Sequence, residues 1–386
     1  MQSFDNFFID SLTELKDKNL YRDQSLINEK LSKTGIKVFS DNDYLGLANN
    51  SYREILKDST KLVAGSTGSR LTTGSQKEHC ELEKLISEWK GTEDTILFNN
   101  GYAANTGALA CLVNSKDAVF IDELAHSCMW DGVKLSSARK YIFKHNDLNQ
   151  LQELLEKYRN KHQKTLIVTE SIFSMDGDFS PIAELQKLSK KYHCNLFIDE
   201  AHSTGIYGSK GAGLIKKLLE EGEIQDYSNM IQMGTLSKGV GIEGAYITGS
   251  KLLIEFLRNK ARTYIYSTAL SPISAKIASE NIKTIQISDS LRKTLNNHIG
   301  LFRKKLNHLI LDKNNFKNFH GPIFTFFFEN EEKCLAASQK LLEQGYFCSA
   351  IRPPTVKESR IRICISAKHE EKDIIRLSEL IAEIMN

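Results

Sequence analysis

The chain of 386 residues contains only 5 prolines and 2 tryptophans, and it has no low-complexity tract or long run of like charge. This excludes collagen-like and proline-rich disordered chains. The 51 Lys and Arg residues nearly balance 48 Asp and Glu residues, for a formal net charge of +3. Such a balance supplies no field of one sign to attract nucleic acid or an anionic membrane surface. We expect neither as a partner.

The 7 cysteines are an odd number, with no CxxC pair and no Cys/His spacing typical of a zinc site. We therefore expect reduced thiols and no bound metal. No apolar run approaches the ~18 residues of a membrane helix, and the N-terminus lacks the basic and apolar regions of a secretion signal. With 41% hydrophobic and 26% charged residues, the composition predicts an ordered cytoplasmic globular protein.

Alternating helical and strand patterns between residues 75 and 265 predict the fold. Apolar, β-branched segments that alternate with amphipathic helices are typical of a mostly parallel sheet covered on both faces, so the predicted class is α/β. The predicted strands are 95–98, 118–122, 140–143, 165–169, 195–199 and 230–234. Further strands at 323–328, 346–351 and 361–365, with a closing helix from Glu370, predict a smaller α+β domain. The predicted domains are an N-terminal arm (1–44), a large domain (45–280) and a small C-terminal domain (281–386).

The helix after Ser75 has a well-defined sequence pattern. Leu82, Ile86 and their apolar neighbours recur at helical spacing, Ser75 with Glu78 predicts a capping box, and Gly91 predicts the helix end. The first helix is expected over residues 4–18.

Lys238 is the first candidate for chemistry. It follows a predicted buried strand and lies among small residues, where desolvation would lower the pKa of an ammonium group and free its amine as a nucleophile or base. Alone, Lys238 would be explained more simply as a surface lysine at a strand end.

A second strand end carries complementary groups. Asp199 closes the strand 195–199 and His202 follows three residues later, at the carboxyl edge where open α/β sheets bind ligands. Pyridoxal phosphate requires a lysine for its imine and a carboxylate that keeps its ring nitrogen protonated. Lys238 and Asp199 supply this pair, although a lone Asp or His at such a position is usually structural.

Three more strand ends add polar residues. The segment 98–105 is a strand-to-helix turn whose free N–H groups could hold a phosphate, and the segments 122–126 and 169–178 follow two other strands. Residues 239–244 match GxGxxG, but the strand-like residues 245–248 follow in place of a helix. We interpret these glycines as bends near Lys238, not as a dinucleotide site.

Together with residues 42–47, 68–71 and 266–268, these segments resemble the α-oxoamine synthases, fold-type-I pyridoxal phosphate enzymes. These enzymes condense an amino acid with an acyl thioester and release carbon dioxide. The resemblance extends from about residue 43 to residue 369, and so many motifs in order are not expected by chance. It implies pyridoxal 5′-phosphate as cofactor, bound by the large domain, and a homodimer with sites at the subunit interface.

The resemblance implies a role for each matching residue. The predicted catalytic residues are Lys238, which would hold the cofactor as an imine, Asp199 at the ring nitrogen and His126 on the ring face. Other predicted cofactor contacts are Gly101, Tyr102, Ser174, His202, Thr235 and Thr268, of which Thr268 would reach the phosphate in the partner subunit. The predicted substrate contacts are Asn42 and Arg362 for the amino-acid carboxylate, with Arg22 and Thr355 for the acyl group.

Residues 68–71 and 350–356 most resemble the family members that condense L-alanine with a pimeloyl thioester, on CoA or acyl carrier protein, in biotin biosynthesis. A sibling synthase that uses glycine or serine with another acyl-CoA is the alternative, because one methylene in a pocket is worth only about 1–3 kcal/mol. A non-catalytic, cofactor-free partner subunit is a rival from another class, opposed by the joint presence of Lys238, Asp199 and His126. A structural alternative for Arg362 is a salt bridge on the strand face that it shares with Arg360.

Overall fold

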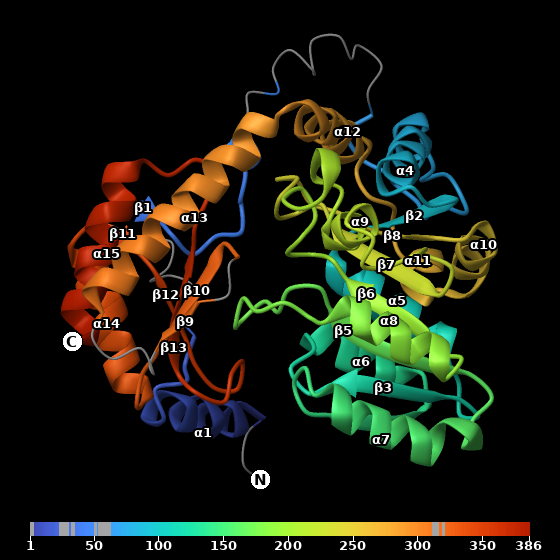
Figure 1. Cartoon of the computed structure of the whole chain (residues 1–386), viewed down its shortest axis with the longest axis horizontal. Coiled ribbons are helices and arrows are strands. Elements are labelled where there is room, and N and C mark those ends of the chain that lie inside the picture. The colour runs from blue at the N-terminus through green and yellow to red at the C-terminus, as the bar shows by residue number, and fades with distance from the viewer. Residues whose placement is uncertain are drawn as a thin grey trace. The chain divides into compact units, whose positions relative to one another are not determined.

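The computed structural model of the chain describes residues 4–22, 31, 35–49, 52, 63–310, 316–318 and 321–386. It divides into two compact units (Figure 1). Unit 1 comprises Met1–Asp41, Met175–Asp178 and Leu295–Asn386, and unit 2 comprises Asn42–Ser174 and Phe179–Thr294.

Unit 2 is built on a seven-stranded sheet with the order β2-β8-β7-β6-β5-β3-β4. Its strands are β2 (Asp94–Phe98), β3 (Ala118–Asp122), β4 (Arg139–Phe143), β5 (Thr165–Glu170), β6 (Asn195–Asp199), β7 (Met230–Thr235) and β8 (Ala245–Gly249). Within this sheet β8 runs antiparallel to both of its neighbours, β2 and β7, whereas β3 to β7 pair in parallel. The predicted α/β class with a mostly parallel sheet is confirmed.

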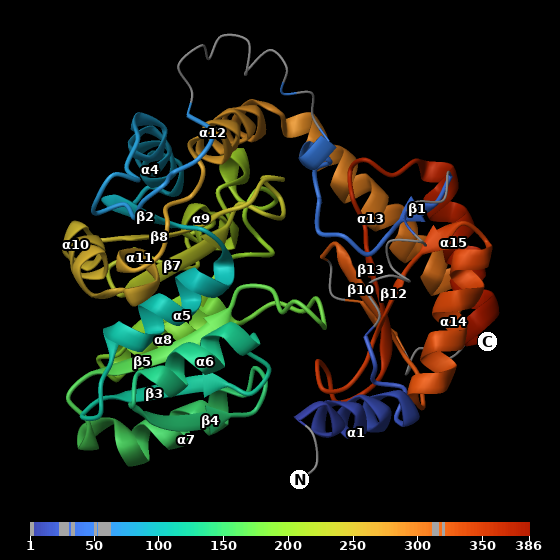
Figure 2. The same ribbon diagram turned by 180° about the vertical axis from the view of Figure 1, so that it is seen from behind.

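Helices cover both faces of this sheet because successive strand residues point to opposite sides. Phe197 belongs to a core with α5, α6, α10 and α11, whereas Leu196 and Ile198 belong to a core with α7, α8 and α9. In Figure 1 α8 lies on the near face, and in Figure 2 α5 and α6 do. The bounds are α5 (Gly101–Leu112), α6 (Ser127–Leu135), α7 (Leu148–Tyr158), α8 (Ile182–Lys191), α9 (Leu214–Glu220), α10 (Lys251–Lys260) and α11 (Arg262–Ile265).

A further pair of helices, α4 (Lys77–Lys90) and α12 (Pro272–Ile287), packs together in unit 2. Gly91 ends α4 with φ 73° as predicted, but the capping box joins Gln76 and His79, so the prediction of Ser75 and Glu78 was wrong by one residue. The side chain of His79 reaches back to the N-cap backbone, a contact that the usual Glu or Gln pattern does not reveal. The short 3₁₀ helices are η1 (Leu47–Asn49), η2 (Arg159–Lys161) and η3 (Ser209–Gly211).

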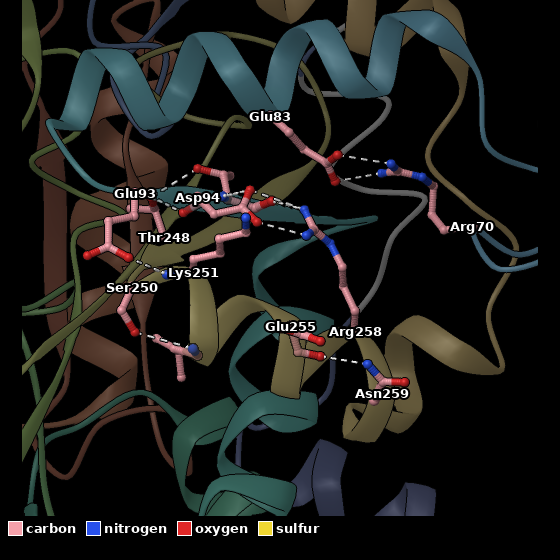
Figure 3. Close-up of polar contacts among 12 residues, drawn as sticks. Arg70, Glu83, Glu93, Asp94, Thr248, Ser250, Lys251, Glu255, Arg258 and Asn259 are labelled. Carbon is pink, nitrogen blue, oxygen red and sulfur yellow. Dashed lines mark hydrogen bonds and ion pairs between the residues drawn. The ribbon is translucent and has the colours of Figure 1, made fainter.

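Two arginines tie loops and helices to this part of unit 2 (Figure 3). Arg70 donates from both terminal nitrogens to Glu83 on α4, at 2.8 and 3.0 Å, and Arg258 on α10 makes a similar pair of bonds to Asp94 on β2. Fork-to-fork bonds of this kind fix orientation as well as distance. They hold the Arg70 segment against α4 and hold α10 against the edge strand.

Unit 1 contains a four-stranded antiparallel sheet with the order β12-β13-β10-β9, and β1 pairs in parallel with β11. Its elements are α1 (Phe4–Asp17), β1 (Lys37–Val38), β9 (Phe316–Asn318), β10 (Ile323–Phe327), α14 (Glu331–Glu343), β11 (Tyr346–Phe347), β12 (Ser349–Ile351), β13 (Arg360–Cys364) and α15 (Glu371–Met385). Helix α13 (Asp289–Leu309) contains the boundary with unit 2. The segment 346–351, predicted as one strand, is two strands because β11 and β12 join different sheets.

Two other features, a membrane-spanning helix and a cluster of metal ligands, are absent from the described residues. None of the described helices has both the length and the apolar character needed to cross a membrane. In the same residues, no group of three or more His, Cys, Asp and Glu side chains is arranged to hold a metal ion.

His369 makes unit 1 sensitive to acid. Its ring stacks on Phe39 at 3.7 Å, its Nε2 donates to the Val38 carbonyl oxygen at 3.0 Å, and its Nδ1 accepts from the Ser366 N–H at 3.1 Å. This pattern requires a neutral ring. Burial is the main reason that the pKa of His369 falls to about 4, from an ordinary value near 6.5.

We expect His369 to contribute stability above pH 6.5 that is lost as the pH falls from about 6.5 to about 4, because the unfolded state binds the proton first. The loss is about 3 kcal/mol in the free energy of unfolding. His369→Gln should remove part of this acid sensitivity in denaturation curves at pH 7 and pH 5, whereas the exposed control His308→Gln should not. An unchanged pH dependence in His369→Gln would contradict the neutral buried ring.

Candidate active site

A pocket in unit 2 opens at the carboxyl ends of β5, β6 and β7. The predicted residues that line it are Gly101, Tyr102, His126, Asp199, His202, Thr235 and Lys238. These residues come from four separate strand ends or helix starts, and the parallel sheet gathers them because all its strand ends of one sense lie on one edge. Ser174 and Thr268 do not line this pocket; Thr268 is exposed and lines a second depression with Arg70 and Asn99.

A line of hydrogen bonds leads from Lys238 into the interior. Lys238 Nζ lies 2.8 Å from His202 Nε2, His202 Nδ1 lies 2.6 Å from the Tyr44 hydroxyl, and that hydroxyl donates to Asn42 Oδ1 at 3.1 Å. Because the Tyr44 proton is used on Asn42, its oxygen accepts from His202 Nδ1, and His202 Nε2 then accepts from Lys238. One tautomer of His202 satisfies the whole line.

Asp199 is a buried carboxylate held from two sides. Its Oδ1 accepts from the Ala201 N–H and its Oδ2 accepts from Asn105 Nδ2, both at 2.7 Å, and the residue is 5% exposed. Asn105 comes from α5, so this helix fixes the orientation of the carboxylate. Both oxygens therefore act as acceptors, which is the role that a carboxylate beside a protonated pyridine nitrogen must fill.

The ring of His126 is neutral and lies at the mouth of the pocket. Its Nδ1 accepts from the Cys128 N–H at 3.3 Å and lies 2.9 Å from the Cys128 sulfur, so the ring proton is on Nε2. Partial burial lowers the pKa of His126, Asp199 opposes this shift, and Lys238 adds to it. Burial raises the pKa of the Cys128 thiol to about 12, which makes this sulfur a proton donor and not a nucleophile.

The residues of the pocket fit pyridoxal phosphate. They supply an amine, a carboxylate, a flat neutral ring and, at Gly101 and Tyr102, the N-terminal N–H groups of a 12-residue helix. Two buried oxygens, Asn105 Oδ1 and Glu170 Oε1, have no hydrogen-bond partner among the described residues. Native proteins rarely leave a buried polar atom without a hydrogen-bond partner.

Three of the predicted substrate contacts belong to unit 1. Arg22 Nη2 donates to Thr355 Oγ1 at 2.9 Å, which brings together two exposed residues 333 positions apart that were both predicted to contact the acyl group. Arg362 is buried on β13 and donates to the Cys364 sulfur at 2.9 Å. Arg360, on the same strand, forms a buried ion pair with Asp176 at 2.9 Å. Asn42, the fourth contact, is in unit 2.

Sequence reasoning assigned no role to Tyr44, Asn105 or Glu170, although each falls inside a segment that it singled out. Tyr44 is completely buried, Asn105 is 1% exposed and Glu170 is 2% exposed. For Asn105 and Glu170 the available signal was a polar side chain within an otherwise apolar helix or at a strand end. That signal shows that a partner is needed and does not identify it.

The comparisons with known proteins agree with this geometry. The family model described as aminotransferase class I and II matches residues 35–381. The chain belongs to this family. A relative from Methanococcus vannielii, named "Putative 8-amino-7-oxononanoate synthase", is 42% identical over 384 residues, covering 97% of each chain. A relative of the same name from Acaryochloris marina is 39% identical over 353 residues, covering 90% of this chain and 88% of its own.

Solved structures of the aminotransferase class I and II fold also match. Serine palmitoyltransferase from Sphingomonas wittichii has a TM-score of 0.83 and 25% identity, covering 90% of this chain and 87% of its own. For 8-amino-7-oxononanoate synthase from Francisella tularensis the TM-score is 0.76 and the identity 27%, covering 91% and 98%. These likenesses confirm the predictions of an α-oxoamine synthase fold and of a pyridoxal-phosphate-dependent acyltransferase.

Tyr44→Phe tests the hydrogen-bond line from Lys238. Without the Tyr44 hydroxyl, His202 Nδ1 loses the oxygen that lies 2.6 Å away, so the free energy of unfolding should fall by about 1–3 kcal/mol. Tyr246→Phe is the control, because this tyrosine is also fully buried and bonds Thr204 at 3.0 Å outside the pocket. Both variants should lose similar stability in denaturant titrations, but only Tyr44→Phe should weaken the retention of pyridoxal phosphate. Equal retention in the two variants would contradict the role of this line.

Proposed function

We propose that the protein condenses L-alanine with a pimeloyl thioester to form 8-amino-7-oxononanoate, carbon dioxide and the free thiol. The observation that carries this proposal is that Lys238, Asp199 and His126 line one pocket. The relatives that match this chain over nearly its whole length are named for that synthase. The thioester is carried by CoA or by an acyl carrier protein. A homodimer and a cytoplasmic location, both expected from the sequence, belong to the same proposal.

Bound pyridoxal phosphate supplies an electron sink for negative charge on the amino-acid Cα. Lys238 Nζ would hold the cofactor, and its free amine would be the group that accepts the Cα proton. Its bond to His202 Nε2 at 2.8 Å directs the amine into the pocket from one side. Asp199 would keep a proton on the ring nitrogen, and the neutral ring of His126 would cover the cofactor without adding a charge there.

Substrate binding falls to residues that are largely in unit 1. Arg362 presents a planar fork that matches a carboxylate, and it does so from a buried strand position, where the interaction is strengthened by low solvent screening. Arg22 and Thr355 hold each other at 2.9 Å and present a cation and a hydroxyl to the acyl thioester. Asn42 supplies an amide for the amino-acid carboxylate.

A sibling reaction, with glycine or serine and another acyl-CoA, is the second candidate. It is favoured by the structural likeness to serine palmitoyltransferase, whose TM-score of 0.83 exceeds the 0.76 of the Francisella synthase. Fold similarity of this degree reports the shared scaffold and not the size of the acyl pocket. The identities near 40% to relatives named for the pimeloyl reaction favour the first candidate.

The substrate proposal is tested by a matrix of amino acids and thioesters. Alanine, glycine and serine are combined with pimeloyl-, acetyl-, succinyl- and palmitoyl-CoA, and with pimeloyl acyl carrier protein, while thiol release and the amino ketone product are measured. We expect alanine with a pimeloyl thioester to have the highest kcat/KM, and Lys238→Ala to abolish turnover. A higher kcat/KM for serine with palmitoyl-CoA would assign the sibling reaction.

Arg362→Ala tests the carboxylate contact. Loss of charge-assisted bonds worth about 1.5–3 kcal/mol should weaken alanine binding about 10- to 100-fold and leave the affinity for pyridoxal phosphate unchanged. Both affinities can be followed through the absorbance of the bound cofactor. Arg360→Ala is the matched control on the same strand, and it should reduce stability more than alanine affinity because Arg360 is paired with Asp176. Parallel losses of both affinities in Arg362→Ala would indicate a structural arginine.

A further inference from the structure

Glu170 occupies a central place in the pocket. It is the last residue of β5 and is in register with Asp199 on the neighbouring parallel strand. Residues in register on parallel strands point to the same face of a sheet, and both side chains line the pocket. Glu170 is 2% exposed, so its carboxyl group is almost wholly removed from water.

The carboxyl group of Glu170 lies near two cofactor-binding segments. The backbones of His126 and Ser174 are close enough to favour its charged form and so to oppose the rise of its pKa. His126 is proposed to stack on the cofactor ring and Ser174 to contact the ring oxygen. Oε1 of Glu170 is buried, with no hydrogen-bond partner among the described residues. An acceptor oxygen in this position would be costly, whereas a hydroxyl would be a donor ready for a ligand.

The charges around the pocket decide where a proton is held. Asp199 faces Glu170 from β6, Lys238 from the loop after β7, and His126 with the Cys128 thiol from the start of α6. Two neighbouring buried carboxyl groups do not both ionise readily, and one keeps a proton. Asp199 has a donor on each of its oxygens, whereas Glu170 Oε1 has none among the described residues. The proton is therefore on Glu170.

We propose that Glu170 is a protonated acid at neutral pH and that its Oε1–H donates a hydrogen bond to an anionic oxygen of the occupied pocket. That oxygen is the ring oxygen of the cofactor or a carboxylate oxygen of the amino acid. The inference rests on the proposed function, because it requires a pyridoxal phosphate pocket. Burial, with Asp199 adding to it and Lys238 opposing it, raises the pKa of Glu170 to about 8.

Three variants test whether Glu170 acts as a hydrogen-bond donor, as a negative charge or only as a structural residue. Glu170→Gln keeps the shape and an N–H donor without ionising, and Glu170→Met removes the donor. Asp122→Asn is the matched control: Asp122 ends β3, is fully buried, and accepts the N–H groups of Leu124 and Asn146 at 2.8 and 2.9 Å outside the pocket. Each purified protein is measured for stability and for pyridoxal phosphate affinity, with and without alanine.

We expect Glu170→Gln to stay within about 3-fold of the wild-type affinity and Glu170→Met to lose about 10-fold, the value of one hydrogen bond to a charged group. A loss that is present with cofactor alone assigns the ring oxygen, and one that requires alanine assigns the carboxylate. Equal losses in Gln and Met variants would overturn the proposal, because they would show that the negative charge matters. The proposal would also be overturned if neither Glu170 variant lost affinity for pyridoxal phosphate and both showed only the reduced stability that Asp122→Asn shows.

A second readout does not depend on the cofactor. The C=O stretching band of a protonated carboxylic acid should be visible in the infrared spectrum of the cofactor-free wild type at pH 7, should disappear as the pH rises through about 8, and should be absent from Glu170→Gln. Absence of the band from wild type would refute the protonated acid even if Glu170→Met did not fold. Failure of the wild type to bind pyridoxal phosphate at all would instead refute the proposed function, so the two failures are distinguishable.

Discussion

The ion pair between Lys90 and Glu200 holds together the part of unit 2 that carries the candidate site. Lys90 is 1% exposed and Glu200 is fully buried. Such charges are tolerated only when every bond is made: Glu200 accepts from Lys90, Ser203 and Ile215, and Lys90 also donates to the Ala212 carbonyl at 2.6 Å. Glu200 lies between Asp199 and the turn that carries His202. One buried carboxylate therefore positions the end of α4, the start of α9 and this turn.

Much of the fold is encoded locally enough to be predicted. Every strand expected in the large sheet is present, because continuous apolar runs such as 195–199 suit only a strand buried on both faces. Errors arose where a distant partner overrides the local pattern. The segment 346–351 divides because β1 and β13 each take a part of it, and the cap of α4 depends on a histidine that also bonds Leu270. Neither partner can be identified from neighbouring residues.

The candidate site was partly predictable for the same reason. Lys238, Asp199 and His126 follow strands or start a helix, so the topology alone brings them to one edge. Asn105 and Glu170 were not assigned roles because their importance depends on distant neighbours, which are the Asp199 carboxylate for Asn105 and the Asp199 strand position in register for Glu170. The buried partner of Arg360 is Asp176, 184 positions away. A long-range pairing of this kind has no local signature in one sequence.

Unit 1 is assembled from both ends of the chain, residues 1–41 and 295–386, with four residues from the middle. Unit 2 is nearly continuous between residues 42 and 294. During synthesis, which proceeds from the N-terminus, unit 2 can therefore complete its sheet while the last quarter of the chain is still being made. The N-terminal arm can make its contacts with β11 and Thr355 only after those residues have been synthesised. The pocket around Lys238 is thus an early product of folding, and the pair Arg22–Thr355 is among its last.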